Sequence, residues 1–563
     1  MHRFRSTNPS ASARPRLFHL GLLCLLPSLI AAAPPAENTA ETFAAATAAA
    51  REANRTAEPV APGPFAANWE SLKAYRVPDW FRDAKFGIWA HWSPQGQPEM
   101  SDWYARIMYM PKGRPAWSRD IYNFHLVRYG HPSKFGYKDI TNTFKVERWD
   151  PASLIALYKK AGAQYFVALA NHHDNFDLWN SKYQPWNSTL IGPKRDMIGE
   201  WAEATRKAGL HFGVSLHGAR AWRWFEVAQG ADADGPLAGV PYDGKLTAKD
   251  GAGQWWDGLD PQDLYAQNHA IGAPYSKDYK RKFYNRVFDL VNKYNPDLLY
   301  FDDHVLPFYE EDKNDSLKIA AHFYNHSIAT HHHKNEAVLT TKRLDEEQRK
   351  ALVYDIERGR SDAILPQPWQ TDTCIGEWHY SLPAYERGSY KSAHAVLQML
   401  IDIVSKNGNL LLSIPVRKDG TLDDLELGIL NDLAAWMEVN REAIFATRPW
   451  KVYGEGPSTT TPQEKGSFEG IKDVGEYAAD DVRFTVAKDG KTIYAVLMAP
   501  APGEVRIKSL GRDAALAGTD VRRVELLGGK QRLKWSQEGG ALVVQSAFAS
   551  APANPAVLKI SLK

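Results

Sequence analysis

A buried strand that ends on acids opens the search for chemistry in this chain. The apolar run Leu298–Phe301 follows Pro296, and Asp302, Asp303 and His304 come directly after it. A short apolar run after a proline is typical of a strand inside a sheet. Carboxylates at the end of such a strand are placed to act as a nucleophile, a base or an acid. The alternative is a pair of solvated acids at the start of a loop.

Imidazoles follow three other apolar segments in the same way, and these are His91, the pair His172 and His173, and His217. Adjacent histidines on a strand point to opposite faces, so one can reach a ligand while its neighbour packs. Such histidines could bind a metal, but the chain has no His-Glu-x-x-His or Cys-x-x-Cys spacing. We therefore expect no metal cofactor. A separate run, His331–His333, is interpreted as the solvated end of a helix.

Two carboxyl groups are what the hydrolysis of a glycosidic bond requires. One is ionised, as nucleophile or base, and the other is protonated and donates to the leaving oxygen. Asp302 is the candidate for the ionised group, because its strand fixes its backbone. Glu357 and Glu377 are both candidates for the acid, since both lie beyond that strand and near aromatic residues. For either glutamate alone, a surface carboxylate is the simpler interpretation.

The elements that carry these residues alternate between strand and helix. Helices are predicted over 151–162, after the cap residue Asp150, over 197–208, after Asp196, and over 279–294. The strands are near-continuous apolar runs, which is typical of a parallel sheet covered by helices. Polar groups follow strand after strand, and a barrel gathers all strand ends on one face. We therefore predict a TIM-like (β/α) barrel of the α/β class.

Pattern changes divide the 563 residues into four parts. Residues 1–33 carry arginines, an apolar run and small alanines, which together predict a secretory signal peptide and export to the periplasm or the medium. Residues 34–66 are rich in Ala, Pro, Glu and Thr and are predicted to form a linker or one poor helix. The barrel is predicted over 67–450. Short alternating segments over 451–563 predict a C-terminal β-sandwich.

Composition argues against several classes of partner. The 68 basic and 66 acidic residues leave a net charge of +2, which gives no support to binding of nucleic acid or an anionic membrane. The 19 Trp, 25 Tyr and 22 Phe residues suit sugar binding, although large cores use the same residues. Removal of the signal peptide leaves Cys374 alone, so we expect no internal disulfide. The oligomeric state is not predicted.

Eight segments stand in an order that matches one known family, and these are 85–92, 101–104, 171–179, 296–302, 369–373, 377–380, 406–412 and 447–450. Together they resemble the α-L-fucosidases of glycoside hydrolase family 29. The resemblance runs from about Trp69 to the C-terminus. Its most specific parts are the His-His-Asp stretch at 172–174 and the Lys-Asn-Gly-Asn-Leu-Leu-Leu stretch at 406–412.

The resemblance implies a TIM-like barrel followed by a β-sandwich, and retaining hydrolysis through a covalent intermediate without a cofactor. Asp302 stands where the family has its nucleophile, and Glu357 resembles its acid/base, with Glu377 as the alternative. The implied substrate is a terminal fucose on a fucosylated oligosaccharide or glycoconjugate. Ring binding is implied for His91, Trp103, His172 and His173, and the further residues expected to line the pocket are Asp102, His217, Tyr300 and Trp378.

Three positions depart from the family's usual pattern, and these are Asp102 for Glu, Tyr300 for Trp and Asp303 for Gly. An unpaired carboxylate at Asp303 would raise the pKa of Asp302, and His304 is a candidate partner for it. The segment 215–222 also differs. These departures bear on the sugar and the linkage, so a related enzyme such as an α-L-galactosidase, or a fucose-binding protein without activity, stays as an alternative.

Overall fold

The computed structural model describes the chain from residue 39 to residue 563, leaving out residues 113–118, 517–519, 546–547 and 549. The predicted signal peptide, residues 1–33, lies outside the described residues and stays a prediction. None of the described helices combines the length and the apolarity needed to cross a bilayer.

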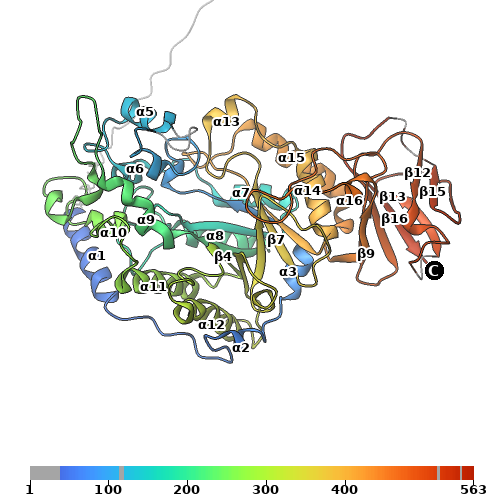
Figure 1. Cartoon of the computed structure of the whole chain (residues 1–563), viewed down its shortest axis with the longest axis horizontal. Helices are drawn as coiled ribbons and strands as arrows, with labels where there is room; N and C mark the ends of the chain where they lie inside the picture. The colour runs from blue at the N-terminus through green and yellow to red at the C-terminus, as the bar shows by residue number, and fades with distance from the viewer. Residues whose placement is uncertain (1–38, 113–118, 517–519, 546–547, 549) are drawn as a thin grey trace, which may run out of the picture. The chain divides into compact units, whose positions relative to one another are not determined.

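Eight parallel strands close into a barrel in sequence order, and β1 pairs with both β2 and β8 (Figure 1). The strands are β1 (Phe86–Ala90), β2 (Tyr165–Asn171), β3 (His211–Leu216), β4 (Leu298–His304), β5 (Val338–Lys342), β6 (Val353–Glu357), β7 (Trp369–Cys374) and β8 (Gly408–Ser413). Their residues are almost all buried, because side chains fill the interior and helices cover the outside. The predicted TIM-like barrel is confirmed.

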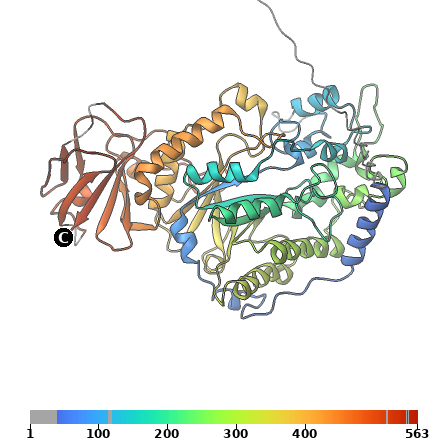
Figure 2. The same ribbon diagram turned by 180° about the vertical axis from the view of Figure 1, so that it is seen from behind.

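Helices lie outside the barrel strands, as Figures 1 and 2 show from opposite sides. The longer ones are α5 (Arg119–Arg128), α7 (Pro151–Lys160), α8 (Met197–Lys207), α11 (Lys277–Tyr294), α12 (Lys313–Thr330), α14 (Ala393–Ser405) and α15 (Asp424–Asn440). The shorter ones are α2 (Trp69–Leu72), α3 (Asp79–Ala84), α4 (Tyr104–Ile107), α6 (Tyr137–Thr143), α9 (Ala221–Trp224), α10 (Pro261–Tyr265) and α13 (Leu382–Glu386). The run His331–His333 follows the end of α12, and its last two residues are exposed, as predicted.

Two helices begin at the predicted cap residues. The carboxylate of Asp150 accepts from the backbone N–H groups of Ala152 and Ser153 at 3.0 and 3.2 Å, at the start of α7. Asp196 accepts from the N–H of Gly199 at 3.0 Å, at the start of α8. These bonds satisfy N–H groups that have no partner inside the helix, which is why short polar residues stand there.

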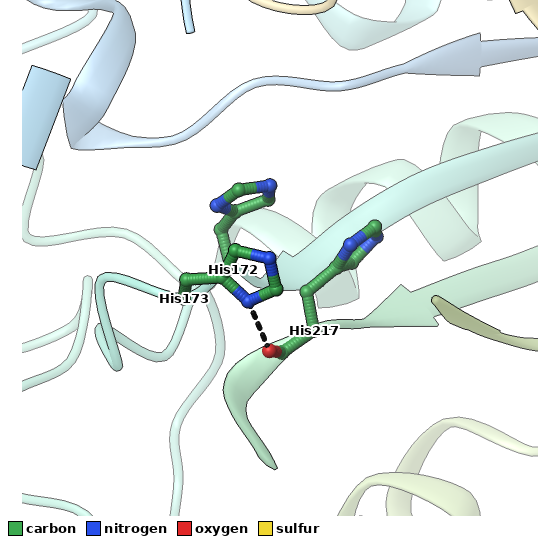
Figure 3. Close-up of side chains that lie close together, drawn as sticks. All are labelled: His172, His173 and His217. Carbon is green, nitrogen blue, oxygen red and sulfur yellow. Dashed lines mark hydrogen bonds between the residues drawn. The ribbon is translucent and has the colours of Figure 1, made fainter. Parts of the chain in front are cut away.

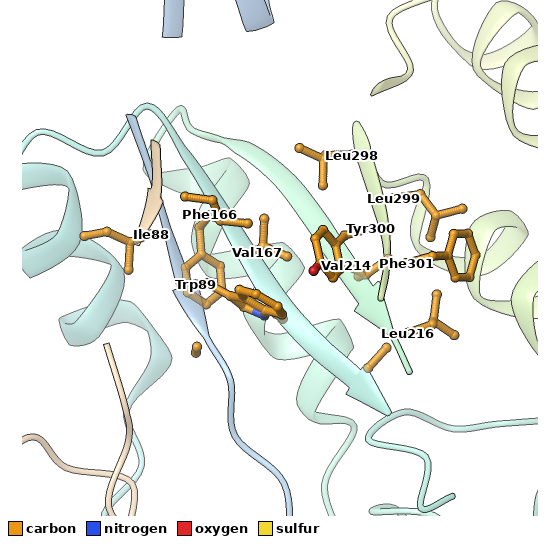
Figure 4. Packing of buried hydrophobic residues seen from close by; sticks show 14 of the residues in the cluster. Ile88, Trp89, Phe166, Val167, Val214, Leu216, Leu298, Leu299, Tyr300 and Phe301 are labelled. Atoms are coloured by element: carbon orange, nitrogen blue, oxygen red, sulfur yellow. The ribbon is translucent and has the colours of Figure 1, made fainter. Parts of the chain in front are cut away.

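The barrel interior is closed by large side chains from neighbouring strands (Figure 4). The indole of Trp89 on β1 donates to Ser215 Oγ on β3 at 3.2 Å, and its ring centre lies 4.9 Å from that of Tyr300 on β4. Trp89 and Tyr300 are both fully buried. This packing fills the barrel interior beneath the polar strand ends.

The segment 39–66, predicted as part of a linker or one poor helix, contains helix α1 (Thr39–Ala53). Phe43, Thr47 and Ala50 are buried, a spacing that puts them on one helical face. Thr47 Oγ1 donates to the carbonyl of Gly258 at 2.9 Å. The residues on that face are mostly small, which is why the sequence shows little hydrophobic periodicity although the helix packs against the barrel domain.

Antiparallel sheets follow the barrel. Five strands pair in the order β13-β16-β11-β10-β9 and three in the order β12-β15-β14, with separate apolar packing between them. Their bounds are β9 (Thr447–Glu455), β10 (Val482–Ala487), β11 (Thr492–Leu497), β12 (Glu504–Ile507), β13 (Val521–Leu526), β14 (Trp535–Gln537), β15 (Leu542–Gln545) and β16 (Ala556–Leu562), with the short helix α16 (Pro457–Thr460) after β9. The predicted C-terminal β-sandwich is confirmed.

A buried carboxylate joins the barrel to this second domain. Asp402 on α14 pairs with Lys406 at 2.7 Å and with Arg360, which follows β6, at 2.8 Å. It also pairs with Arg483 on β10 at 2.6 Å. Burial alone would raise the pKa of Asp402, but the three cations hold it well below its ordinary value. One carboxylate therefore forms ion pairs with cations from both domains.

We expect the Asp402→Asn variant to lose about 3 to 5 kcal/mol of unfolding free energy, because it leaves buried cations without their counter-charge. Urea unfolding followed by tryptophan fluorescence would measure the loss. The matched control is Glu203→Gln, which removes the exposed Glu203–Lys207 pair of α8 and should cost about 0.2 to 1 kcal/mol. Equal losses in the two variants would contradict the prediction.

Candidate active site

A cavity of about 810 Å³ opens at the carboxyl ends of the barrel strands. All residues predicted from sequence for catalysis or binding line it, and these are His91, Asp102, Trp103, His172, His173, His217, Tyr300, Asp302, Glu357 and Trp378. The alternative acid, Glu377, lines it as well. The structure therefore brings together residues that lie up to 287 positions apart in the chain, as a barrel does with its strand ends.

Buried imidazoles form one side of the cavity. The ring centres of His172 and His173 lie 4.5 Å apart, and those of His172 and His217 lie 4.8 Å apart. His91 lies 5.0 Å from His172. Burial lowers the pKa of all four groups, and it lowers that of His173 to about 3. Near neutral pH these rings are uncharged, so each offers one donor and one acceptor.

Hydrogen bonds fix the state of one ring and leave others open. His173 Nδ1 donates to the carbonyl oxygen of His217 at 2.7 Å, so its Nε2 is an acceptor (Figure 3). Both ring nitrogens of His91 and of His217 are buried and have no hydrogen-bond partner among the described residues. Buried polar atoms normally have partners, so these nitrogens are placed for the hydroxyl groups of a ligand.

Three of these histidines could also hold a metal ion. The ligand atoms of His172, His173 and His217 lie within 4.8 Å of one another, and neutral imidazoles are common zinc ligands. Two of these histidines also lie beside a carboxylate. His217 Nδ1 is 3.7 Å and His173 Nε2 is 4.0 Å from Asp302 Oδ2. The donor set thus fits either a cation or a hydroxylated ligand, and a chelation experiment separates the two.

A lysine lies between the two predicted catalytic carboxyl groups. Lys342 is the last residue of β5, the strand between β4 and β6. Its ammonium donates to Asp302 Oδ1 at 2.6 Å and to Glu357 Oε2. Burial would lower the pKa of Lys342, but the surrounding carboxylates raise it well above its ordinary value, so the ammonium keeps its charge.

The two carboxyl groups have opposite pKa shifts. Burial would raise the pKa of Asp302, but Lys342 and His217 hold it well below its ordinary value. Burial raises the pKa of Glu357 to about 7, with Lys342 opposing the shift and Asp372 adding to it. Near neutral pH one group is therefore ionised while the other retains a proton. Such a divergence is characteristic of a nucleophile and acid pair.

A second polar layer lies below the lysine. Asp372 on β7 stands 3.9 Å from Lys342 and accepts from the Tyr300 hydroxyl at 3.1 Å. Burial, with the charge of Asp372, raises the pKa of Asp355 well above its ordinary value. Asp355 accepts from Gln370 at 2.8 Å. Tyr300 thus ties the cavity floor to this layer through a hydroxyl that a tryptophan would lack.

Asp303 faces away from Asp302, since successive residues of a strand point to opposite sides. Its carboxylate lies 3.5 Å from Arg220 Nε, whereas the expected candidate, His304, is exposed. Burial raises the pKa of Asp303 to about 6. Arg220 also donates to the backbone oxygen of Asp302 at 2.7 Å. The partner of Asp303 is therefore an arginine from the segment after β3, not the adjacent histidine.

The predicted binding residue Asp102 holds a loop in place. Its carboxylate accepts from the backbone N–H groups of Trp378 at 3.3 Å and His379 at 2.7 Å. Trp378 packs 5.5 Å from His91, between ring centres. Trp103 stands beside Asp102 with its side chain 42% exposed. Asp102 thus fixes the positions of the aromatic side chains at the cavity rim.

Three cavity residues, Lys342, Asp372 and Arg220, have no role assigned from sequence. Lys342 is the last residue of its strand, and the site histidines also stand at or after strand ends. This position in the sequence was the signal for a role in the site. Asp372 lies inside one of the family-like segments, but its partners come from other strands. Arg220 lies in the segment 217–276, which forms short helices after β3 and for which the sequence predicts no strand or helix. To predict these three roles, one needs to know which strands and segments are neighbours in the fold.

The family model of the α-L-fucosidases matches residues 52–442. The plasma α-L-fucosidase of Homo sapiens is 26% identical over 495 residues, covering 85% of this chain and 88% of that protein. The human tissue α-L-fucosidase is 26% identical over 501 residues, covering 87% and 88%. A structure of Thermotoga maritima α-fucosidase in complex with a mechanism-based inhibitor superposes with a TM-score of 0.63 at 25% identity, covering 88% of this chain and 100% of that chain. The chain therefore belongs to the α-L-fucosidases of glycoside hydrolase family 29.

Proposed function

We propose that this protein is a retaining, exo-acting α-L-fucosidase that removes terminal α-L-fucosyl residues from glycans through a covalent intermediate on Asp302. The single observation that carries the proposal is the Lys342 ammonium between Asp302 and Glu357, two carboxyl groups with opposite pKa shifts. The relatives named above are α-L-fucosidases, which supports fucose as the sugar. Glu357 takes the role of acid and base.

The spacing of the carboxyl groups supports retention. One ammonium nitrogen donates to both groups, so the facing oxygens of Asp302 and Glu357 lie within about 6 Å of each other. Retaining glycosidases hold their carboxyl groups about 5 to 5.5 Å apart, whereas inverting ones need about 6.5 to 9.5 Å to admit a water molecule. Glu377 makes no ion pair with Lys342 among the described residues, which favours Glu357 as the acid.

In the first step, a carboxylate oxygen of Asp302 attacks the anomeric carbon while Glu357 gives its proton to the glycosidic oxygen. The bond between that carbon and that oxygen breaks, and the aglycone leaves as an alcohol. In the second step, Glu357 takes a proton from water, and the water oxygen displaces Asp302 from the same carbon. Two inversions return the α configuration, and Glu357 is protonated again.

The remaining cavity residues suit a deoxy sugar. The neutral imidazole of His91 has one donor and one acceptor open for vicinal hydroxyls, and His173 Nε2 can accept from another. Trp103 and Trp378 offer apolar surface to the C5 methyl group. Trp89 and Tyr300 are packed at the base of the cavity, which favours a terminal residue over one inside a chain.

Removal of each carboxyl group should give a different stereochemical outcome with azide. We expect Asp302→Ala to lose about 10³-fold or more in turnover of 4-nitrophenyl α-L-fucoside. Azide should rescue it with the inverted β-fucosyl azide as product, since azide enters in place of the nucleophile. Glu357→Ala should be rescued with the retained α-fucosyl azide. Proton NMR of the products is the measurement, and Glu377→Ala is the control that should keep most activity. The retained product from Asp302→Ala would reverse the roles.

The pH profile should report on Lys342. Because Glu357 acts in its protonated form, kcat/KM for a fucosyl disaccharide should fall as pH rises through about 7. Lys342 lowers the pKa of both carboxyl groups, so Lys342→Met should move both limbs of the profile to higher pH. The exposed-lysine variant Lys350→Met should move neither. A basic limb that stays in place in Lys342→Met would contradict the assignment.

Metal removal should leave the enzyme active, because both steps use carboxyl groups alone. We expect dialysis against EDTA to leave the hydrolysis rate of 4-nitrophenyl α-L-fucoside unchanged. The metal content of the protein, read by mass spectrometry before and after dialysis, is the control for removal. A loss of activity that zinc restores would assign His172, His173 and His217 to a metal instead.

A further inference from the structure

A turn of the C-terminal domain forms part of the cavity wall. Lys465 and Ile471 pair across it as an isolated antiparallel bridge, and the N–H of Gly466 donates to the carbonyl of Gly470 at 3.0 Å. Phe468 lies in the turn between these pairs, and its side chain lines the same cavity as the catalytic carboxyl groups. The catalytic cavity therefore includes a side chain from outside the barrel.

Hydrogen bonds tie this turn to the segment that follows β6. Arg360 and Ile471 exchange backbone hydrogen bonds of 3.0 and 2.9 Å, as two residues of a small sheet would. On the other side, the carboxylate of Glu469 accepts from the N–H of Arg343 at 3.0 Å. The turn is thus attached to Arg343, which directly follows β5, and to Arg360, three residues after the end of β6.

The turn and the barrel also approach too closely for side chains at two positions. A Cβ atom on Gly359 would lie 2.6 Å from the carbonyl oxygen of Glu469. Gly470, with φ of +63°, would place a Cβ atom 2.5 Å from the carbonyl oxygen of Arg360. Both contacts are below van der Waals distance, so only glycine allows this approach. The position of the turn is therefore built into both segments.

Phe468 presents its ring to solvent instead of packing it. Its side chain is 49% exposed, and no other aromatic ring among the described residues packs against it. Among the exposed large hydrophobic side chains of the described residues, the aromatic ones are Trp103 and Phe468, and both line the cavity. Exposed aromatic surface is unfavourable in water, and its restriction to this rim indicates a ligand that covers it.

The position of the acid tells which part of a ligand reaches Phe468. Under the proposed function, on which this inference rests, Glu357 donates to the glycosidic oxygen, so the leaving sugar begins beside Glu357. The turn docks at Gly359 and Arg360, which come two and three residues after Glu357 in the chain. We infer that Phe468 is a stacking platform for the apolar face of the pyranose ring attached to the scissile oxygen. Phe468 then selects for substrates with a sugar as the leaving group.

The test compares a substrate that has a leaving sugar with one that has none. The disaccharide is the one that the enzyme cleaves fastest among α-linked fucosyl-galactose and fucosyl-N-acetylglucosamine isomers, and the reference is α-L-fucosyl fluoride. We expect Phe468→Ala to lower the ratio of kcat/KM for the disaccharide to kcat/KM for the fluoride by about tenfold. Phe468→Trp should keep the ratio of the unmodified enzyme. Ile271→Ala, which removes an exposed apolar side chain that does not line the cavity, is the matched control and should change neither rate.

The outcomes separate this inference from the function on which it rests. A ratio in Phe468→Ala equal to that of the unmodified enzyme would overturn the stacking platform, and so would parallel losses on both substrates. A loss in Phe468→Trp as large as in Phe468→Ala would also overturn it. If the unmodified enzyme does not hydrolyse fucosyl fluoride, the proposed function itself fails.

Discussion

One buried ammonium, that of Lys342, determines how charge is distributed over the cavity floor. Burial raises the pKa of carboxyl groups, so without a cation both Asp302 and Glu357 would tend to hold protons and neither would be a good nucleophile. A single cation that contacts both cannot neutralise two carboxylates. It stabilises one negative charge, on Asp302, where His217 and Arg220 add to its effect. The other group keeps its proton, so one side chain separates an ionised carboxyl group from a protonated one.

This arrangement depends on strand order more than on any loop. Lys342 and Glu357 end β5 and β6, and Asp302 lies near the end of β4, so the order of these three consecutive strands in the barrel places the three groups side by side. Below them, Asp372 and Tyr300 fill the interior with groups that are hydrogen-bonded to each other. Ordering the long side chain of Lys342 costs conformational entropy, and its ion pairs with the two carboxyl groups offset that cost. The loops, by contrast, bring rim aromatic groups such as Trp103 and Trp378 to the cavity.

Local information in the sequence predicts the barrel and its strand ends, whereas Asp102, Trp103 and Trp378 were predicted through the resemblance to a known family. An apolar run identifies a strand, and the polar residue after it, such as His91 or Asp302, identifies the strand end. The features that the sequence does not predict are contacts between residues that lie far apart in the chain. Lys342 differs from any surface lysine only through its two neighbours, and Asp303 has a partner, Arg220, that lies 83 positions away. Spacing along one chain carries no information about such contacts.

The C-terminal domain also contributes side chains to the cavity wall. Arg360 follows Glu357 closely and has two functions in the fold. Its guanidinium pairs with Asp402 and donates to the carbonyl oxygen of Lys472, while its backbone pairs with Ile471. The turn that carries Phe468 is therefore attached to the buried charge cluster that joins the domains. Movement of the β-sandwich away from the barrel would break that cluster and remove the turn from the cavity, so the charges that hold the domains together also keep the cavity wall complete.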